Sequence, residues 1–159
     1  MKRLALLAAS LVAACSSSPV DVTGDYSVQV TNGSNGCNFA NYTVGMPNTN
    51  VPVTITQNGA AVTATVTGVT GDLMVLALGS ASFNGTVDGD NLDLTLTGTR
   101  AQSSGSCAFT YNATINAAVN QNNLMGTIDY TSDTNNSSDC STITGCVTTQ
   151  DFAGSRPPQ

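Results

Sequence analysis

The sequence predicts an all-β protein, and three observations lead to that prediction. Val, Ile, Thr and Tyr, which favour strands, alternate with polar residues at period two along most of the chain. Pairs of turn-forming residues separate these stretches at regular intervals. Glu is absent, Lys occurs only as Lys2, and no long stretch follows the helical period of about 3.6 residues.

The alternation is clearest in the stretches 26–30, 51–55, 62–66, 92–96 and 107–119. Because strand side chains point alternately to two faces, one face of each stretch should be buried. We expect the buried set to contain Phe109, Tyr111, Ile115, Val119, Leu92, Leu94, Leu96, Leu124 and Ile128. We expect the solvent-facing set to contain Thr110, Asn112, Thr114, Thr95 and Thr97.

The turn-forming pairs indicate that successive strands join as hairpins. These pairs are Asn32-Gly33, Asn35-Gly36, Asn58-Gly59, Asp88-Gly89 and Asn122-Asn123. A similar order of residues recurs in 83–92 and 115–124, as repeated hairpins of an up-and-down meander would give. Closure removes exposed strand edges, so we expect a closed or partly closed antiparallel barrel of about eight or nine strands. A β-sandwich is the alternative.

One stretch, 72–79, departs from alternation because six apolar residues follow one another. A short helix with Asp72 as its N-cap and Gly79 at its end fits this stretch. A strand buried on both faces also fits, as does an exposed apolar lip that meets a ligand or a membrane.

The N-terminal segment has the layout of a secretory signal peptide. Lys2 and Arg3 precede an apolar stretch at 4–13, which is shorter than the ~20 residues of a transmembrane helix. The residues that follow, Val12-Ala13-Ala14-Cys15, resemble the lipobox of bacterial lipoproteins.

That resemblance implies cleavage before Cys15 and attachment of lipid to its thiol, which makes a bilayer the first expected partner. It also implies sorting to the outer membrane, in a cell that has one, because Ser16 and not Asp follows the cysteine. The chain then divides into a signal peptide (1–14), a lipidated cysteine with a flexible tether (15–23), one β domain (24–153) and a C-terminal tail (154–159).

The remaining four cysteines are Cys37, Cys107, Cys140 and Cys146, an even number that indicates disulfides in an exported protein. Cys37 and Cys107 share a Cys-x-Phe pattern near the start of a strand, and Cys140 and Cys146 enclose only five residues. We therefore expect the pairs 37–107 and 140–146. A zinc site is the alternative, although neither pair has CxxC spacing.

The composition excludes several function classes. After residue 15 the basic residues are Arg100 and Arg156, against ten Asp, so binding of nucleic acid through phosphate contacts is excluded. His and Glu are absent and a Ser nucleophile would lack a base, so we expect no enzyme. Asp88, Asp90 and Asp93 fit a solvated hairpin better than a calcium site, so we expect no cofactor apart from the lipid on Cys15.

Two classes of function remain: a barrel that binds a small molecule, a glycan or a protein, and a structural surface-coat lipoprotein without a pocket. A protease-inhibitor barrel is a third, weaker idea. The pattern of strands is similar to that of small lipocalin-like barrels on bacterial lipoproteins, and Gly24-Asp25-Tyr26 partly resembles their Gly-x-Trp signature, with Tyr in place of Trp. If a pocket exists, its candidate lining residues are Tyr42, Phe83, Phe109 and Tyr111; simple core packing is the other role for these rings.

Overall fold

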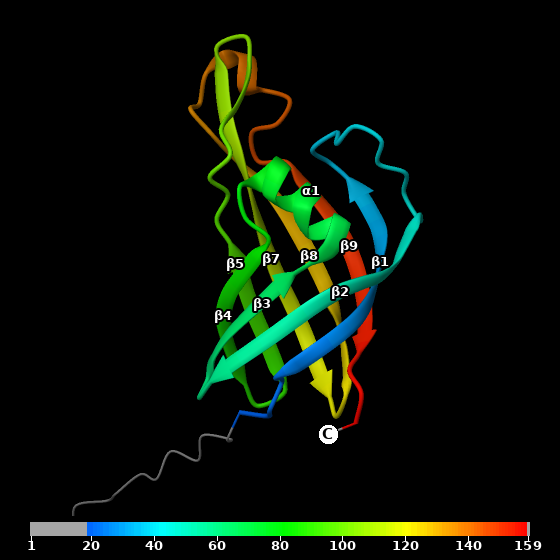
Figure 1. Cartoon of the computed structure of the whole chain (residues 1–159). Helices are drawn as coiled ribbons and strands as arrows, with labels where there is room; N and C mark the ends of the chain where they lie inside the picture. The colour runs from blue at the N-terminus through cyan, green and yellow to red at the C-terminus, as the bar shows by residue number, and fades with distance from the viewer. Residues whose placement is uncertain (1–18, 159) are drawn as a thin grey trace, which may run out of the picture.

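The structure, a computed structural model, describes residues 19–158. It confirms the all-β prediction and consists mainly of a single sheet of nine strands (Figure 1). Its elements in chain order are β1 (Gly24–Asn35), β2 (Pro47–Asn58), β3 (Ala61–Val66), α1 (Gly68–Leu78), β4 (Ser82–Asp88), β5 (Asn91–Leu96), β6 (Gln102–Ser104), β7 (Cys107–Asn120), β8 (Asn123–Thr134), the short 3-10 helix η1 (Ser138–Cys140) and β9 (Val147–Ser155).

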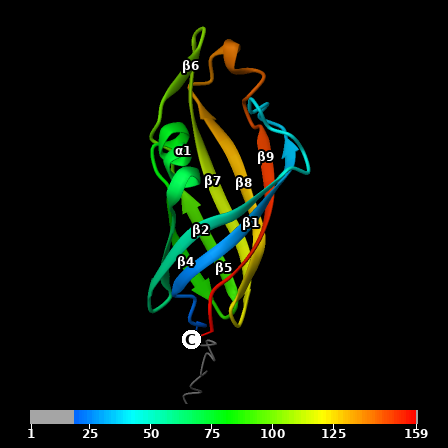
Figure 2. The ribbon, with the colours of Figure 1, turned by 45° about the vertical axis from the view of Figure 1, so that its right-hand side comes forward.

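Eight of these strands close into a barrel. Sequence neighbours pair antiparallel from β1 to β5 and from β6 to β9. In addition, β5 pairs with β7, and the last strand, β9, pairs with β1. The small strand β6 pairs only with the outer end of β7 and forms a hairpin that extends beyond the barrel (Figure 2). The meander topology therefore agrees with the prediction, and the sandwich alternative is wrong.

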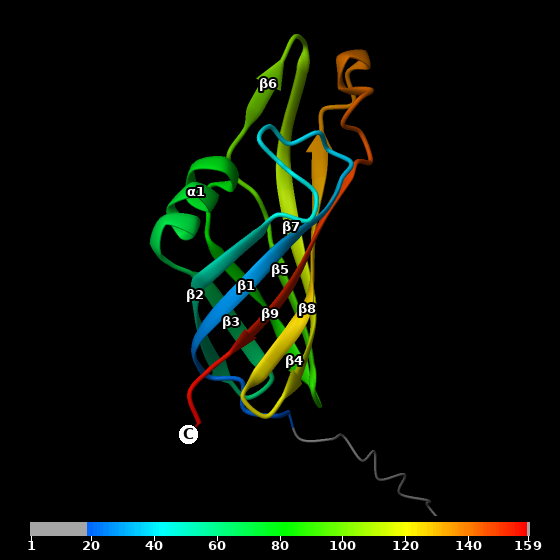
Figure 3. The same cartoon turned by 90° about the vertical axis from the view of Figure 1, so that its right-hand side faces the viewer.

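The two ends of the barrel differ in their connections. At one end, which we call the closed end, tight turns join β2 to β3, β4 to β5 and β7 to β8, and both termini of the described chain lie beside them (Figure 1). At the other end, which we call the open end, lie the long connections 36–46, 97–106 and 135–146, together with α1 (Figure 3).

The alternation in the sequence predicts the facing of the strands well. Leu92, Leu94 and Leu96 are each 1% exposed, whereas Thr95 and Thr97 are exposed. Tyr111, Val119 and Leu124 are buried as predicted. Three residues of the expected buried set, Phe109, Ile115 and Ile128, are half-buried, and so are three of the expected solvent set, Thr110, Asn112 and Thr114.

Most of the apolar stretch at 72–79 belongs to the helix α1, so the alternative of a strand buried on both faces is wrong. It begins one turn earlier than predicted, after Thr67, so Asp72 lies inside the helix and is not its N-cap. Its end at Gly79 is confirmed: this glycine has φ 90° and its N–H donates to the carbonyl of Val75. Gly71 is buried, and a Cβ at this position would lie 2.3 Å from the carbonyl oxygen of Val66, so a glycine permits the close packing of α1 on β3.

The predicted boundaries of the domain are too narrow at both ends. Val22, placed in the flexible tether, is 0% exposed and belongs to the core. The N–H of Val20 donates to the carbonyl of Gly89 at 3.0 Å, and the N–H of Val22 donates to Oε1 of Gln57 at 2.8 Å. Arg156, placed in the tail, is 9% exposed. The segment 20–23 thus seals the closed end, and the domain extends through residue 156.

One predicted turn is also wrong. Asn32-Gly33 does not end a strand, because β1 continues to Asn35 with an irregularity in its pairing with β9. The pairs Asn58-Gly59 and Asp88-Gly89 do lie at hairpin turns, Asn122-Asn123 lies at the turn between β7 and β8, and Asn35-Gly36 ends β1.

Candidate functional site

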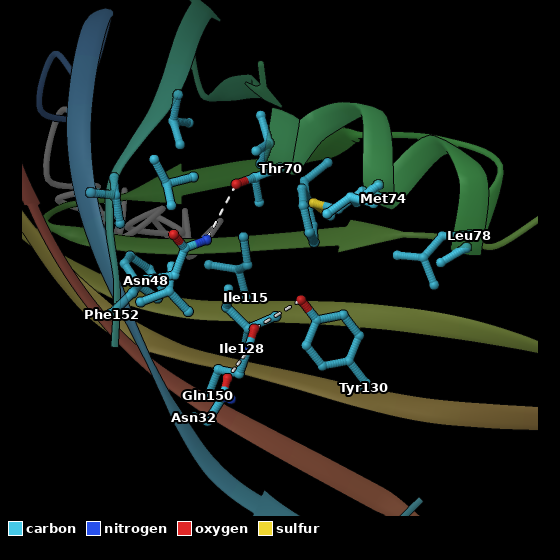
Figure 4. Close-up of a pocket in the computed structure, with 18 of the residues that line it drawn as sticks. Asn32, Asn48, Thr70, Met74, Leu78, Ile115, Ile128, Tyr130, Gln150 and Phe152 are labelled. Atoms are coloured by element: carbon cyan, nitrogen blue, oxygen red, sulfur yellow. Dashed lines mark hydrogen bonds between the residues drawn. The ribbon is translucent and has the colours of Figure 1, made fainter. Parts of the chain in front are cut away.

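The barrel contains an internal cavity of about 730 Å³, within the range of about 300–1,000 Å³ that is usual for small-molecule sites. It extends from Leu92 and Leu124, near the starts of β5 and β8 at the closed end, to α1 and the connection between β1 and β2 at the open end. Met74 and Leu78 of α1 lie over it in Figure 4. Its walls are mainly apolar and come from the inward faces of the strands and from α1. They include Val28, Val53, Ile55, Val66, Met74, Leu78, Phe83, Leu92, Leu94, Ile115, Leu124, Ile128 and Phe152.

The cavity explains why two residues of the predicted core face are only half-buried. Ile115 and Ile128 point inward, as alternation requires, but part of their surface faces the cavity and not another side chain (Figure 4). Towards the closed end the interior is filled instead, by buried side chains such as Val22, Val62 and Val87. These buried side chains fill the closed end and do not line the cavity.

A short chain of polar side chains crosses one wall of the cavity. The hydroxyl of Tyr130 donates to Oε1 of Gln150 at 3.0 Å, and Nε2 of Gln150 donates to Oδ1 of Asn32 at 2.8 Å. Opposite them, Nδ2 of Asn48 donates to the hydroxyl of Thr70 on α1 at 3.3 Å (Figure 4). These polar groups satisfy one another, which lowers the cost of placing them in an apolar wall.

The electrostatic character of the cavity is neutral. Among the described residues that line it, none is Asp, Lys or Arg. Burial raises the pKa of Tyr130 to about 12, with a smaller contribution from Tyr42, and burial also raises the pKa of Tyr111. The tyrosines of the wall are therefore uncharged phenols at neutral pH.

The open end carries exposed apolar side chains around the helix. Val69 is 76% exposed, Leu73 59% and Leu76 64%, and Val44 and Met46 of the connection between β1 and β2 are 66% and 55% exposed. Leu73 and Met46 also line the cavity. The stretch 72–79 is thus mainly helical and exposes apolar side chains such as Leu73 and Leu76. Contact of these side chains with a ligand or a membrane stays a prediction.

Three of the four predicted lining residues, Tyr42, Phe83 and Tyr111, do line the cavity. Phe109 does not; its ring packs edge-on against Tyr111, with the ring centroids 5.4 Å apart. Tyr130 also lines the cavity and is absent from the predicted set, although it lies two residues after Ile128 in the same alternating series and is thereby marked as inward-facing.

The polar residues Asn32, Asn48 and Gln150 were also missed. Alternation places Asn32, two residues after Val30, and Gln150, two residues before Phe152, on the inner face, but it does not indicate that an inward amide lines a cavity. Asn48 falls outside the alternation of β2 because the pairing of β1 with β2 is irregular there. Thr70 and Met74 line the cavity from α1. The sequence does not predict this position, because it leaves open whether the stretch is a helix.

The disulfide pairing differs from the prediction. Cys37 is bonded to Cys146 and Cys107 to Cys140. The first bond follows from barrel closure, because β1 pairs with β9 so that Asn35 faces Thr148. The strands are antiparallel, so Cys37, two residues after Asn35, lies opposite Cys146, two residues before Thr148.

The second bond follows from contacts between η1 and the hairpin of β6 and β7. The carboxylate of Asp139 accepts from both the N–H and the hydroxyl of Ser106, each at 2.8 Å, which places Cys140 beside Cys107. These hydrogen bonds lower the pKa of Asp139. Both disulfides lie at the open end, where they fasten the long connections, and they indicate folding in an oxidising compartment. The thiols of these four cysteines are therefore not available for the zinc alternative.

The predicted lipidation site, Cys15, lies outside the described residues, as do the signal peptide and Ser16. Within residues 19–158, the structure contains no helix long and apolar enough to cross a bilayer. The same residues contain no cluster of three or more potential metal ligands of the Asp, Glu, His or Cys type.

Fold and cavity together define a small exported β-barrel with one closed end, one open end and an uncharged apolar interior. Comparison of the chain with models of known families finds no match, and comparisons with curated proteins and with solved structures find none either.

Proposed function

We propose that the protein is a lipid-anchored, exported binding protein whose barrel holds a small apolar molecule. The observation that carries the proposal is the internal cavity of about 730 Å³ with mainly apolar walls. Removing apolar ligand surface from water contributes about 25 cal/mol per Å², which favours an apolar occupant over a heavily hydroxylated glycan. A surface-coat role requires no such space, because a filled interior would be more stable.

Titration with N-phenyl-1-naphthylamine, an uncharged dye that fluoresces in apolar surroundings, tests this proposal. We expect saturable binding of about one dye per barrel. Ala64→Phe, which adds a ring inside the cavity, should weaken the binding. Ala64 is 4% exposed and lines the cavity, whereas Ala118 is exposed on β7. Ala118→Phe is therefore the matched control and should bind the dye as the wild type does. Absence of saturable binding to the wild-type protein would exclude the binding role.

The lipid anchor is a separate part of the proposal and rests on the sequence Val12-Ala13-Ala14-Cys15. Cys15→Ser should abolish lipidation and release the protein from the membrane fraction. Mass spectrometry of the N-terminal peptide checks the modification directly. A wild-type protein that is fully soluble and whose processing is insensitive to globomycin would contradict the anchor while leaving ligand binding untouched.

A further inference from the structure

The cavity walls offer no partner for a charged group, which restricts the classes of ligand that the cavity can bind. The described chain contains two arginines, and neither lines the cavity. Arg156 is held at the closed end by hydrogen bonds to backbone carbonyls, and Arg100 is exposed. A carboxylate or phosphate moved into this space would lose its hydration without gaining a cation, and the ten Asp of the chain would add repulsion. An ammonium group would find no carboxylate in the walls either.

The walls offer a buried polar group that the protein leaves unused. Tyr111 is 9% exposed and lines the cavity, and its hydroxyl has no hydrogen-bond partner among the described residues. Among the described residues, every side-chain oxygen or nitrogen that is fully buried has a hydrogen-bond partner. Because the Tyr111 hydroxyl has none, it is not fully buried and a small molecule can contact it. The other phenol deep in the wall, Tyr130, is already bonded to Gln150.

The ring of Tyr111 is also held in position. Phe39 packs edge-on against it with the ring centroids 4.9 Å apart, and Phe109 does so at 5.4 Å. A hydroxyl on a fixed ring loses little freedom when it bonds a ligand. Burial raises the pKa of Tyr111, so this hydroxyl stays protonated and can both donate and accept.

The position of Tyr111 along β7 sets the direction of the occupant. Ile115 follows it by four residues towards the closed end, a distance of about 13 Å along a strand, and faces the apolar part of the cavity. A polar end near Tyr111 therefore leaves room for an apolar chain that extends past Ile115 towards Leu124 and Phe152.

Resting on the proposed binding function, we infer that the ligand is an uncharged amphiphile with a hydroxyl or carbonyl oxygen, and that the Tyr111 hydroxyl is its hydrogen-bond partner. Long-chain alcohols, ketones and esters belong to this class; free fatty acids and lipid phosphates do not.

Displacement of N-phenyl-1-naphthylamine by matched ten-carbon compounds tests this inference. At about pH 8, where a carboxyl group is ionised, 1-decanol and methyl nonanoate should displace the dye, and decanoate and decylammonium should do so at least about tenfold less effectively. Tyr111→Phe should weaken 1-decanol about five- to tenfold and change the dye affinity less than about twofold.

Tyr26→Phe is the matched control, because its hydroxyl donates to the carbonyl of Val22 at the closed end and Tyr26 does not line the cavity. It should leave the ratio of decanol to dye affinity unchanged. Wild-type protein that binds the dye but takes decanoate as well as decanol would overturn the exclusion of anions. An unchanged decanol affinity in Tyr111→Phe would overturn the role of that hydroxyl. In both cases the proposed binding function would stand, whereas a wild type that binds no dye would remove both.

Discussion

The guanidinium carbon of Arg156 lies 5.7 Å from the centroid of the Tyr26 ring, which joins the residue that follows the last strand, β9, to the first strand, β1. The same guanidinium donates to the carbonyl oxygens of Asp21 and Thr23 and to Oδ1 of Asn122. One side chain thereby connects the N-terminal segment, β1 and the turn between β7 and β8 at the closed end.

Arg156→Met should lower the free energy of unfolding by about 2–4 kcal/mol, because it keeps the apolar stem and removes three hydrogen bonds from a charged donor. Arg100→Met is the control, since Arg100 is exposed and its side chain has no hydrogen-bond partner among the described residues. It should change the free energy by less than about 0.5 kcal/mol. Urea unfolding followed by circular dichroism measures both, and equal effects would contradict the role of Arg156.

The two disulfides should appear in a non-reduced peptide map as Cys37–Cys146 and Cys107–Cys140. Chain entropy suggests that the first, with a sequence separation of 109 residues, contributes about 5 kcal/mol, and the second, with a separation of 33, about 4 kcal/mol. Replacing both cysteines of a pair with Ser should therefore destabilise the protein more for 37–146 than for 107–140. A peptide that links Cys140 to Cys146 would contradict this disulfide pairing.

Leu94→Asp should prevent folding, whereas Thr95→Asp should be tolerated. Leu94 is 1% exposed on the inner face of β5, and its neighbour Thr95 is exposed on the outer face. A carboxylate inside the barrel would have no cation, and such a burial costs more than about 4 kcal/mol. Comparison of the two thermal unfolding midpoints checks the prediction, and it fails if they shift equally.

Tyr130 should make the protein sensitive to alkali. Because burial raises its pKa from 10.0 to about 12, the folded state favours the protonated phenol. The associated stability is fully present below about pH 10 and is lost as the pH rises through about 12, at most about 2.7 kcal/mol for a shift of two units. Tyr130→Phe should flatten the decline of the unfolding free energy across this window, measured by urea titrations at successive pH values. An unchanged slope would mean that Tyr130 does not titrate there.

Much of the barrel could be predicted from local patterns, because alternation depends only on neighbouring residues in the chain. The inward positions Leu92, Leu94 and Leu96 and the turn at Asn58-Gly59 are local in this sense. Closure is not local: it pairs β1 with β9 across most of the chain, and the disulfide between Cys37 and Cys146 depends on it. That is why the short loop between Cys140 and Cys146 was a misleading guide.

Turn prediction from local patterns fails at Gly33 for the same reason, because a contact with a distant strand decides the structure there. The Asn32-Gly33 pair has the composition of a hairpin turn, yet the glycine lies within β1, where a Cβ would come 2.5 Å from Oγ1 of Thr149. The glycine is needed there because β9 approaches closely, and β9 lies more than a hundred residues away in sequence. The cavity could not be predicted for a related reason, since a strand that faces empty space carries the same alternation as one that faces a packed core.

The sealing of the closed end by 20–23 has a consequence for orientation. Cys15 precedes Val20 by five residues, which span at most about 18 Å when fully extended. A lipid on Cys15 would therefore hold the closed end close to the bilayer and direct the helix α1 and the cavity entrance away from it. Such a protein would exchange its ligand with the aqueous space or with a second membrane facing it, and not with the leaflet in which it is anchored.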